Sequence, residues 1–488
     1  MKYSISILFA ILLGFAVFAQ APDSLWTRTF GGSGFDEGKS VQQSPDGGYI
    51  ITGFKESVPT GYFDVYLLKT DANGDTLWTR TFGGSDDDAG SSVDTTTDGG
   101  YIITGYTDSY GAGFGDVWLI KTDVNGDTLW TKTYGGTSLD WGFSVQPTTD
   151  GGYIIGGVTQ SFGAGYFDAW LIKTDVDGDS LWTKTFGGSD LDVGTSVRQT
   201  LDGGYVITGY TRPSVAGFSD LWIINTDING DTLWTKTYGG SYDDQGNSIQ
   251  QTTEGGYIIA GFTESFGSGN GDVWLIKTDS NGDTLWTKVF VGSDYYDDAW
   301  RNSAVQTSDG GYIITGHQGY HDVLLIKTDG SGDTLWTKTF GGNGNDWGAS
   351  VQQTTDGGYI IAGGTFSFGA GYSDAYLIKI APDVTSINGI SQTIINDYHL
   401  QQNYPNPFNP TTTISYRLPA RSRVELAIYN LLGQQIRTLV NAHQNAGAYQ
   451  VQWDGRNDAG KQVGSGIYFY QLKAGNDFVE TKKMVLMR

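Results

Sequence analysis

The tripeptide Leu-Trp-Thr occurs seven times along this chain of 488 residues, at an almost constant interval. Its tryptophans lie 52 residues apart in five steps and 50 apart in the last; they are Trp26, Trp78, Trp130, Trp182, Trp234, Trp286 and Trp336. Self-similarity at such a period is typical of repeat architectures, in which each unit contacts its neighbours. A residue present in every copy therefore helps to build the unit, whereas a departure in one copy is free to serve a ligand.

Each unit contains four segments with β-strand signals. In the second copy they are residues 90–96, 100–106 and 117–122, preceded by residues 76–82. The continuous apolar run Val117 to Ile120 predicts a strand covered on both faces, in the middle of a sheet. The alternating segment 77–82 predicts a half-exposed outer strand, and Asn73-Gly74 predicts the tight turn between these two strand types. Four antiparallel strands in each of seven units predict an all-β fold, a seven-bladed β-propeller.

The two ends of the repeat array complement each other. The array begins with an isolated outer strand, residues 23–30, and ends after residues 374–380, where the following outer strand is missing. We expect the first strand to complete the last blade and close the ring, because closure pairs two edges that would otherwise promote aggregation. An open solenoid is the alternative.

Composition and the first residues predict an exported protein. Residues 1–19 combine Lys2, an apolar core and a Val-Phe-Ala cleavage pattern, as in a signal peptide, and we expect no membrane span in the mature chain. The chain has no cysteine, which excludes disulfides and thiolate chemistry. Its net charge of −24 argues against nucleic acid as a partner, since phosphate binding needs clustered Lys and Arg.

The C-terminal segment carries the closest family resemblance. Residues 403–416 read Asn-Tyr-Pro-Asn-Pro-Phe-Asn-Pro-Thr-Thr-Thr-Ile-Ser-Tyr, and the chain closes on Lys-Lys-Met-Val-Leu at 482–486. This series resembles the type A sorting domain of type IX secretion substrates. The resemblance implies that residues 403–488 engage the type IX machinery and that the protein is secreted, extracellular or attached to the outer cell surface. Alternation of Val424, Leu426 and Ile428 independently predicts a small immunoglobulin-like β-sandwich, and an ordinary adhesive sandwich is the alternative. The predicted division is therefore a signal peptide at 1–19, a propeller at 20–381, a linker at 382–402 and the sorting domain at 403–488.

The repeats resemble quinoprotein-like propeller blades less closely. Residues 69–84 share the Asp, turn, Gly, Leu-Trp and Gly-Gly order of those blades. That resemblance implies the blade only: the quinone enzymes often use adjacent cysteines, and this chain has none, so we predict no cofactor.

Three recurring sets of aspartates invite a chemical interpretation. The Asp-x-Asn-Gly-Asp turns, such as Asp71 to Asp75, offer oxygen ligands for Ca²⁺, but they lack the calcium-loop layout, and a turn-forming role is favoured. A second set precedes a Gly at the start of the innermost strand, as in Asp88, and we expect it to bind loop amides. A third set begins the apolar strand, as in Asp116. In six copies an aromatic residue stands two positions before this aspartate. A carboxylate beside an exposed aromatic ring suggests sugar binding, although loop capping is favoured. The aromatics are Tyr62, Phe114, Tyr166, Phe218, Tyr320 and Tyr372.

The sixth unit departs most from the pattern. Its segment from Phe290 to Val305 is four residues longer than Phe82 to Val93, and its segment from Gly316 to Asp322 is five residues shorter than Gly105 to Asp116. Both changes fall on one predicted face, so we expect a ligand site there; neutral loop drift is the alternative. The candidate residues are Tyr295, Tyr296, Asp298, Trp300, Arg301, His317, Tyr320, His321 and, from the next unit, Trp347.

No nucleophile motif, phosphate loop or zinc spacing supports an enzyme, and a two-histidine metal site at His317 and His321 has little support. The first hypothesis is a secreted propeller that binds a glycan or a protein. The alternative is a polysaccharide-degrading enzyme on the same scaffold, which would need two carboxyl groups at a defined separation.

Overall fold

The computed structural model describes residues 21–57, 60–212, 217–268, 271–290, 302–318, 322–383, 398–400, 403, 406, 408–418, 421–444, 447–475 and 478–487. The predicted signal peptide lies outside these residues. The chain divides into two compact units, Met1–Ser386 and Ile387–Arg488, and each is described by itself. Among the described residues, no helical segment has the length and hydropathy of a membrane span.

The first unit consists of seven four-stranded antiparallel sheets, one for each repeat, as predicted. Their innermost strands are β2 (Asp36–Gln43), β6 (Asp88–Thr95), β10 (Asp140–Pro147), β14 (Asp192–Gln199), β18 (Asp244–Gln251), β22 (Ser303–Gln306) and β26 (Asp346–Gln353). The second strands are β3 (Tyr49–Glu56), β7 (Tyr101–Thr107), β11 (Tyr153–Thr159), β15 (Tyr205–Thr211), β19 (Tyr257–Thr263), β23 (Tyr312–Gln318) and β27 (Tyr359–Thr365).

The third strands are buried along nearly their whole length, as their continuous apolar runs predict; they are β4 (Phe63–Thr70), β8 (Asp116–Thr122), β12 (Asp168–Thr174), β16 (Asp220–Thr226), β20 (Asp272–Thr278), β24 (Asp322–Thr328) and β28 (Asp374–Ile380). The outer strands alternate between exposed and half-buried residues; they are β5 (Thr76–Phe82), β9 (Thr128–Tyr134), β13 (Ser180–Phe186), β17 (Thr232–Tyr238), β21 (Thr284–Phe290), β25 (Thr334–Gly341) and β1 (Ser24–Phe30). We number the blades 1 to 7 in chain order from β2–β5 to β26–β28.

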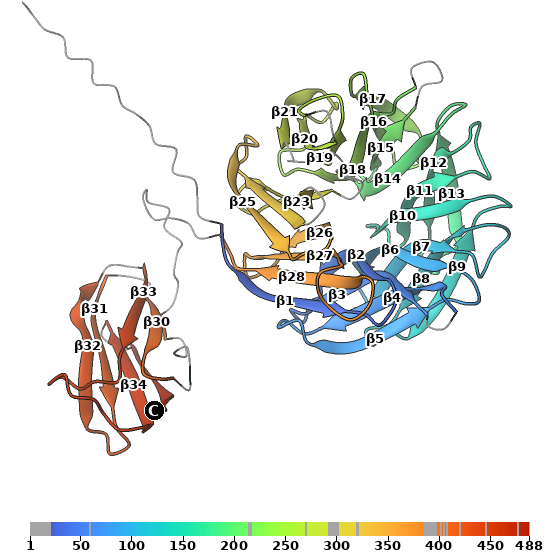
Figure 1. The fold of residues 1–488 in the computed structure, drawn as a ribbon. Coiled ribbons are helices and arrows are strands. Elements are labelled where there is room, and N and C mark those ends of the chain that lie inside the picture. Colours follow the sequence, from blue (N-terminus) through green and yellow to red (C-terminus); the bar gives the residue numbers. More distant parts are fainter. Residues whose placement is uncertain are drawn as a thin grey trace, which may run out of the picture. The chain divides into compact units, whose positions relative to one another are not determined.

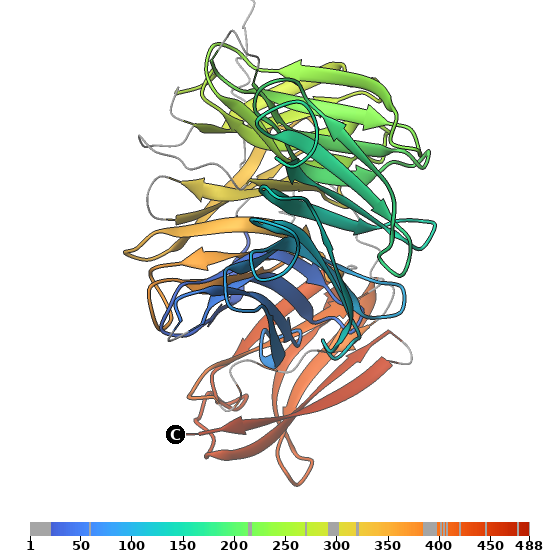
Figure 2. The same ribbon diagram turned by 90° about the vertical axis from the view of Figure 1, so that its right-hand side faces the viewer.

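The N-terminal strand β1 closes the ring. It pairs antiparallel with β28 as the fourth strand of blade 7, and in both views the blue and orange strands lie side by side (Figure 1, Figure 2). We call the contact between blade 7 and blade 1 the closing junction. There the amide of Val41 donates to Ser350 Oγ at 3.3 Å. Between blades 2 and 3, the amide of Val145 donates to Ser92 Oγ at 3.3 Å. The closing junction thus uses the same inner-strand contacts as an internal one, and the predicted closure is confirmed.

The Leu-Trp-Thr motif holds neighbouring blades together at their outer strands. Trp78 packs on Gly126 in the turn of the next blade, so closely that a Cβ on this glycine would lie 2.6 Å from the indole. Gly126 has a φ of 79°, which the tight turn requires and L side chains rarely adopt. Two residues after the tryptophan, Arg80 forms an ion pair of 3.0 Å with Asp127 of the same turn. The repeat is therefore defined as much by contacts between blades as by contacts within them.

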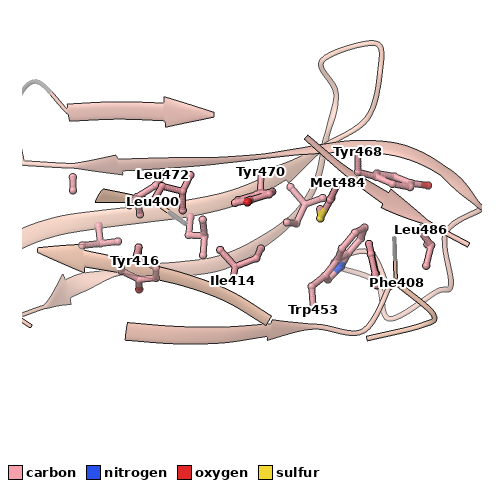
Figure 3. Packing of buried hydrophobic residues seen from close by; sticks show 14 of the residues in the cluster. Leu400, Phe408, Ile414, Tyr416, Trp453, Tyr468, Tyr470, Leu472, Met484 and Leu486 are labelled. Carbon is pink, nitrogen blue, oxygen red and sulfur yellow. The ribbon is translucent and has the colours of Figure 1, made fainter. Parts of the chain in front are cut away.

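The second unit is a two-sheet sandwich, as the alternation predicts. One sheet has the order β29 (His399–Leu400), β30 (Thr412–Leu418), β33 (Gly447–Trp453), and the other has the order β32 (Gln435–Gln444), β31 (Ser422–Tyr429), β34 (Gly466–Ala474), β35 (Phe478–Leu486). Trp453, Phe408, Met484 and Leu486 lie together in its buried core (Figure 3).

Candidate functional site

The starts of the first and third strands of a blade lie on one edge of the sheet. Thr107 of β7 pairs with Asp88 at the start of β6 and with Asp116 at the start of β8. We call this edge of the ring the loop face, because it carries the loops between second and third strands and the connections between blades. Both sets of aspartates therefore lie on one face of the ring, as predicted.

The recurring aspartates of the loop face are buried and bind their own loops. Asp140 is fully buried; its Oδ2 accepts from Gly136 N at 2.8 Å and from Ser161 Oγ at 2.6 Å. Asp168 Oδ2 accepts from the amides of Ala164 and Gly165, both at 3.0 Å. These contacts agree with the capping interpretation and remove both carboxylates from a surface ligand.

The aromatics two residues before the third strand remain exposed. Their exposed fractions are 43% for Tyr62, 75% for Phe114, 63% for Tyr166, 42% for Phe218 and 67% for Tyr372. A second set of aromatics, which we did not predict, packs at a tilt against buried aromatics of the third strand; the ring centroids of Tyr110 and Trp118 lie 5.4 Å apart. The other members are Phe162, Phe266 and Phe368. The sequence signal for this set is a Ser-aromatic-Gly triplet that begins eight residues after the start of a second-strand Tyr-Ile-Ile segment.

Among the described residues of the loop face, four aromatic rings gather where blade 7 meets blade 1. Phe35 of blade 1 stacks on Tyr372 of blade 7, with ring centroids 5.0 Å apart and an interplanar angle of 9°. Phe366 contacts Phe35 edge-on at 6.4 Å and Trp347 at 5.6 Å. Phe35, Phe366 and Tyr372 are 38%, 46% and 67% exposed. We call Phe35, Trp347, Phe366 and Tyr372 the closure platform.

Charged groups surround the closure platform. Trp347 Nε1 donates to Glu37 Oε1 at 3.0 Å, and Phe35 N donates to Glu56 Oε2 at 2.7 Å. Burial raises the pKa of Asp36 beneath the platform, while the Gly32 amide and the ammonium of Lys55 oppose that rise. The platform thus presents aromatic faces beside carboxylates, of which Glu37 is held by an indole.

No other junction in the described residues has this combination. The positions of Phe35 and Phe366 are occupied by Asp87 and Glu56 between blades 1 and 2, and by Leu139 and Asp108 between blades 2 and 3. Between blades 4 and 5 they are Asp243 and Arg212. Both positions vary between blades, and among the described junctions only the closing one carries a phenylalanine at each of them.

Seven of the nine predicted site residues lie outside the described residues: Tyr295, Tyr296, Asp298, Trp300, Arg301, Tyr320 and His321. His317 belongs to β23, but its side chain is outside the description. Trp347 is described, and its indole reaches across to Glu37 of blade 1. Its position is not unique, since Trp141 begins β10 in the same way.

One alignment in the sixth unit is wrong by a residue. Ala304 pairs with Ile314 in the way that Val93 pairs with Ile103, so Ala304 takes the place that the sequence comparison gave to Val305. The insertion is accordingly three residues long. Because side chains alternate along a strand, the slip exchanges the two faces: Ala304 is buried at 4%, and Val305 points to the opposite side.

The turn aspartates accept hydrogen bonds from the amides of their own turns. Asp71 Oδ1 accepts from Asn73 N at 2.8 Å and from Asp75 N at 2.9 Å, which is an Asx turn, and Asp75 faces Arg28 of the preceding outer strand at 3.3 Å. Hydrogen bonds to Asp75 N and Asn73 lower the pKa of Asp71. Within the described ranges, no three His, Asp or Glu side chains gather as metal ligands.

Comparisons with known proteins assign the second unit more closely than the first. Residues 406–477 match the FlgD Ig-like domain family. The chain is 25% identical over 246 residues to the regulatory protein FlaEY of Caulobacter vibrioides. The alignment covers 45% of this chain and only 25% of FlaEY, so the chain spans about a quarter of that relative's length.

Solved structures share the architecture at low identity. PorZ, a bacterial surface component of the type IX secretion system of Porphyromonas gingivalis, aligns at 12% identity with a TM-score of 0.45, over 94% of this chain and 60% of its own. Sqt1 of Chaetomium thermophilum aligns at 12% identity with a TM-score of 0.41, over 70% and 82%. A likeness at this level says nothing about the ligand. The strand topology makes the first unit a seven-bladed propeller, and the second unit is an Ig-like sandwich in which residues 406–477 match the FlgD Ig-like domain family.

Proposed function

We propose that the protein is a secreted or surface-displayed propeller that binds a glycan through the closure platform. The carrying observation is the exposed, parallel pair Phe35 and Tyr372, flanked by Phe366. Aromatic faces stack on the apolar faces of sugar rings, and the half-buried carboxylate of Glu56 can accept hydrogen bonds from hydroxyl groups, whereas Glu37 is 3% exposed and holds the indole of Trp347. The acidic charge of the chain favours a neutral glycan over an anionic one.

Burial supports binding over hydrolysis. A glycosidase needs a carboxylic acid and a carboxylate that both reach the substrate. The recurring aspartates beside the platform, Asp36 and Asp374, are 0% and 3% exposed and are held by loop amides. They support the loops and do not reach a sugar on the surface.

A glycan array with the full chain tests this proposal. We expect saturable binding to at least one glycan without release of reducing sugar, and a loss of about tenfold or more for Tyr372→Ala. Phe114→Ala is the matched control, because Phe114 holds the same place in blade 2. Equal losses for both variants, or retention of only proteins on the loop face, would contradict the glycan proposal; release of reducing sugar that Asp→Asn substitution abolishes would favour the enzyme.

We also propose that the Ig-like domain directs export by a type IX system. Its support is the motif series from residue 403 to 488, which resembles the sorting domain. Lys482 and Lys483 lie on β35; the side chain of Lys482 is partly exposed and that of Lys483 is exposed, and Lys482 forms an ion pair of 3.2 Å with Glu480.

The export test must separate recognition from folding. Deleting the last ten residues would remove Met484 and Leu486, which are 0% and 1% exposed in the core. We therefore choose Lys482→Ala with Lys483→Ala, and Lys473→Ala as the control on the adjacent strand. In a host with type IX secretion, the double variant should accumulate in the periplasm with an unchanged Tm. Normal surface display of the double variant would contradict the proposal.

A further inference from the structure

Opposite the loop face, each blade carries the turns that join its first two strands and its last two strands. We call this edge of the ring the turn face. In six of the seven blades, a lysine at the last position but one of the third strand forms an ion pair with a carboxylate in the first of these turns, at N–O distances of 2.8–3.2 Å. The pairs are Lys69–Asp46, Lys121–Asp98, Lys173–Asp150, Lys277–Glu254, Lys327–Asp309 and Lys379–Asp356.

The ammonium group fits closely into its turn. In blade 1, Lys69 Nζ also donates to Thr70 O at 3.0 Å, and a Cβ on Gly48 would lie 2.8 Å from this nitrogen. The six lysine side chains are only 0–7% exposed. Burial raises the pKa of Asp98 in blade 2, but a hydrogen bond from Lys121 and further hydrogen bonds within the turn hold it at about 2. Each of these turns therefore has the shape and the acceptors for one ammonium group.

Blade 4 keeps the turn but has no lysine. Asn225 takes the lysine position, because it pairs with the tryptophan of the outer strand in the same register as Lys69. Its side chain is shorter and reaches toward the next blade, where Asn225 Nδ2 donates to Tyr257 Oη at 2.9 Å. The ammonium group that the other six turns hold thus has no counterpart in this blade.

The acceptors of that ammonium group remain in blade 4. Asp202 Oδ1 accepts from Thr200 Oγ1 and, at 3.4 Å, from Gly204 N, and Asp202 forms no ion pair in the described part of the chain. The three atoms nearest to a Cβ on Gly204 would be backbone atoms of Thr226 and Asp227, whereas five of the other turns place a lysine nitrogen 2.6–2.8 Å from that position. Blade 4 therefore keeps the groups that accept from the lysine and replaces only the donor.

Exposed apolar side chains flank this turn. Leu201 is 84% exposed and stands where blades 2, 3, 5 and 7 have a threonine. Its backbone is held in place, since its amide donates to Gln251 Oε1 of blade 5 at 2.8 Å. Ile228, which is 60% exposed, lies against the same turn, with Cδ1 3.8 Å from the Cβ position on Gly203. The turn that has lost its lysine thus also offers apolar surface beside its carboxylate.

We propose that the blade 4 turn binds the side chain of a lysine from a protein partner. The partner's ammonium group takes the place that the repeat lysine occupies in the other blades, and it donates to Asp202 and to the carbonyl of Thr226. Its methylene stem packs on Leu201 and Ile228, because lysine stems bury along apolar surface. An inorganic cation would satisfy Asp202 but would leave the exposed Leu201 unexplained. The net charge of −24 favours a basic partner. Since the turn face lies opposite the loop face, this inference does not depend on the proposed glycan ligand.

Methyl NMR of the full chain, titrated with Nα-acetyl-lysine N-methylamide, tests the proposal. We expect the methyl signals of Leu201 and Ile228 to shift saturably. Val176 holds the place of Ile228 in blade 3, where Lys173 fills the turn, so its signals should stay unchanged. The Nε-acetylated form of the probe has no charge and should give no shift at the same concentration. Leu201→Thr, followed at Ile228, should weaken binding roughly fourfold for each methylene group that loses its contact.

Asn225→Lys is the decisive variant. It restores the residue of the other six blades, so it should fold with a Tm at least as high as that of the unmutated chain, and its own ammonium group should abolish binding of the probe. Asp202→Asn, a change at an exposed side chain, should abolish binding as well.

Four results would overturn the proposal. The first is the absence of any shift in the unmutated chain, a measurement that needs no variant to fold. The second is an equal shift at Val176. The third is undiminished binding in Asn225→Lys. The fourth is that NH₄Cl shifts the same signals as strongly as the probe while Leu201→Thr has no effect, which would make the turn a site for an inorganic cation.

Discussion

The junction that closes the ring and the junction between blades 2 and 3 share their inner contacts but differ on the loop face. In both, a valine amide donates to a serine hydroxyl of the neighbouring blade at 3.3 Å. On the loop face, the closing junction has Phe35, Phe366 and Lys55, where the internal one has Leu139, Asp108 and Thr159. The comparison teaches that the repeat maintains the ring through backbone and outer-strand contacts, which leaves the loop positions free to vary.

Removing the closing strand should have the largest effect. Deletion of residues 24–30 takes β1 from blade 7 and exposes the edge of β28. We expect Tm to fall by well over 5 °C, because a lost strand costs on the order of several kcal/mol. Thermal denaturation followed by circular dichroism measures it, and an unchanged melting curve would show that β1 is dispensable for closure.

Converting the closing junction into an internal one should abolish its special surface. Phe35→Leu with Phe366→Asp gives it the residues of the junction between blades 2 and 3. We expect affinity for the glycan found on the array to fall about tenfold or more, since each stacking anchor contributes roughly 1–3 kcal/mol. Tm should stay close to that of the unmutated chain, because both positions are partly exposed. Undiminished affinity would mean that these rings do not contact the ligand.

Two aspartates from neighbouring blades interact on the loop face of each junction, Asp116 with Asp140 between blades 2 and 3 and Asp374 with Asp36 at the closing junction. These pairs should respond differently to pH. The pKa of Asp116 is raised in the folded state, so the ionised group costs stability at neutral pH, and this cost disappears as the pH falls through the folded pKa toward 3.8. Asp116→Asn should therefore raise the free energy of unfolding at pH 7.5 and change it little at pH 4. Asp374→Asn should gain less, because Lys55 already offsets part of the repulsion. A pH-independent gain would contradict the assignment.

The surface ion pairs between blades should matter least. Lys132 and Asp179 lie 2.7 Å apart between blades 2 and 3, while Lys338 and Asp23 lie 3.7 Å apart between blades 6 and 7. Their side chains are substantially exposed, so Lys132→Ala and Lys338→Ala should each change Tm by at most about 2 °C, and high salt should remove the difference. A large, salt-independent shift in either variant would show that the outer strands depend on these charges.

The sequence predicted the blades well because their rules are local and repeated. The repeat period, the alternation and the Asn-Gly turn predicted β5 at residues 76–82, as observed. They predicted the other three strands of the second repeat to within two residues of their observed bounds. The unpaired ends of the array also predicted closure by β1. These signals are averaged over seven copies, so a single irregular residue cannot hide them.

The candidate site was harder to find from the sequence. Phe35 and Phe366 are 331 positions apart along the chain and meet only because the ring closes, so no spacing rule links them. The changed loop lengths of the sixth repeat led us to predict the site there. Ala304, rather than Val305, occupies the position of Val93, because an irregular loop shifts the alignment of the residues that follow it. Trp347 was selected, but as a neighbour of the sixth unit, whereas its indole contacts blade 1.

Hydroxyl-radical footprinting of the full chain, with and without its glycan, tests most directly whether the closing junction is the binding surface. The account predicts protection of Phe35, Phe366 and Tyr372, with no change at Phe114 and Tyr166, which occupy the place of Tyr372 in blades 2 and 3. Equal protection of the exposed aromatics in every blade, or none at the closure platform, would contradict it.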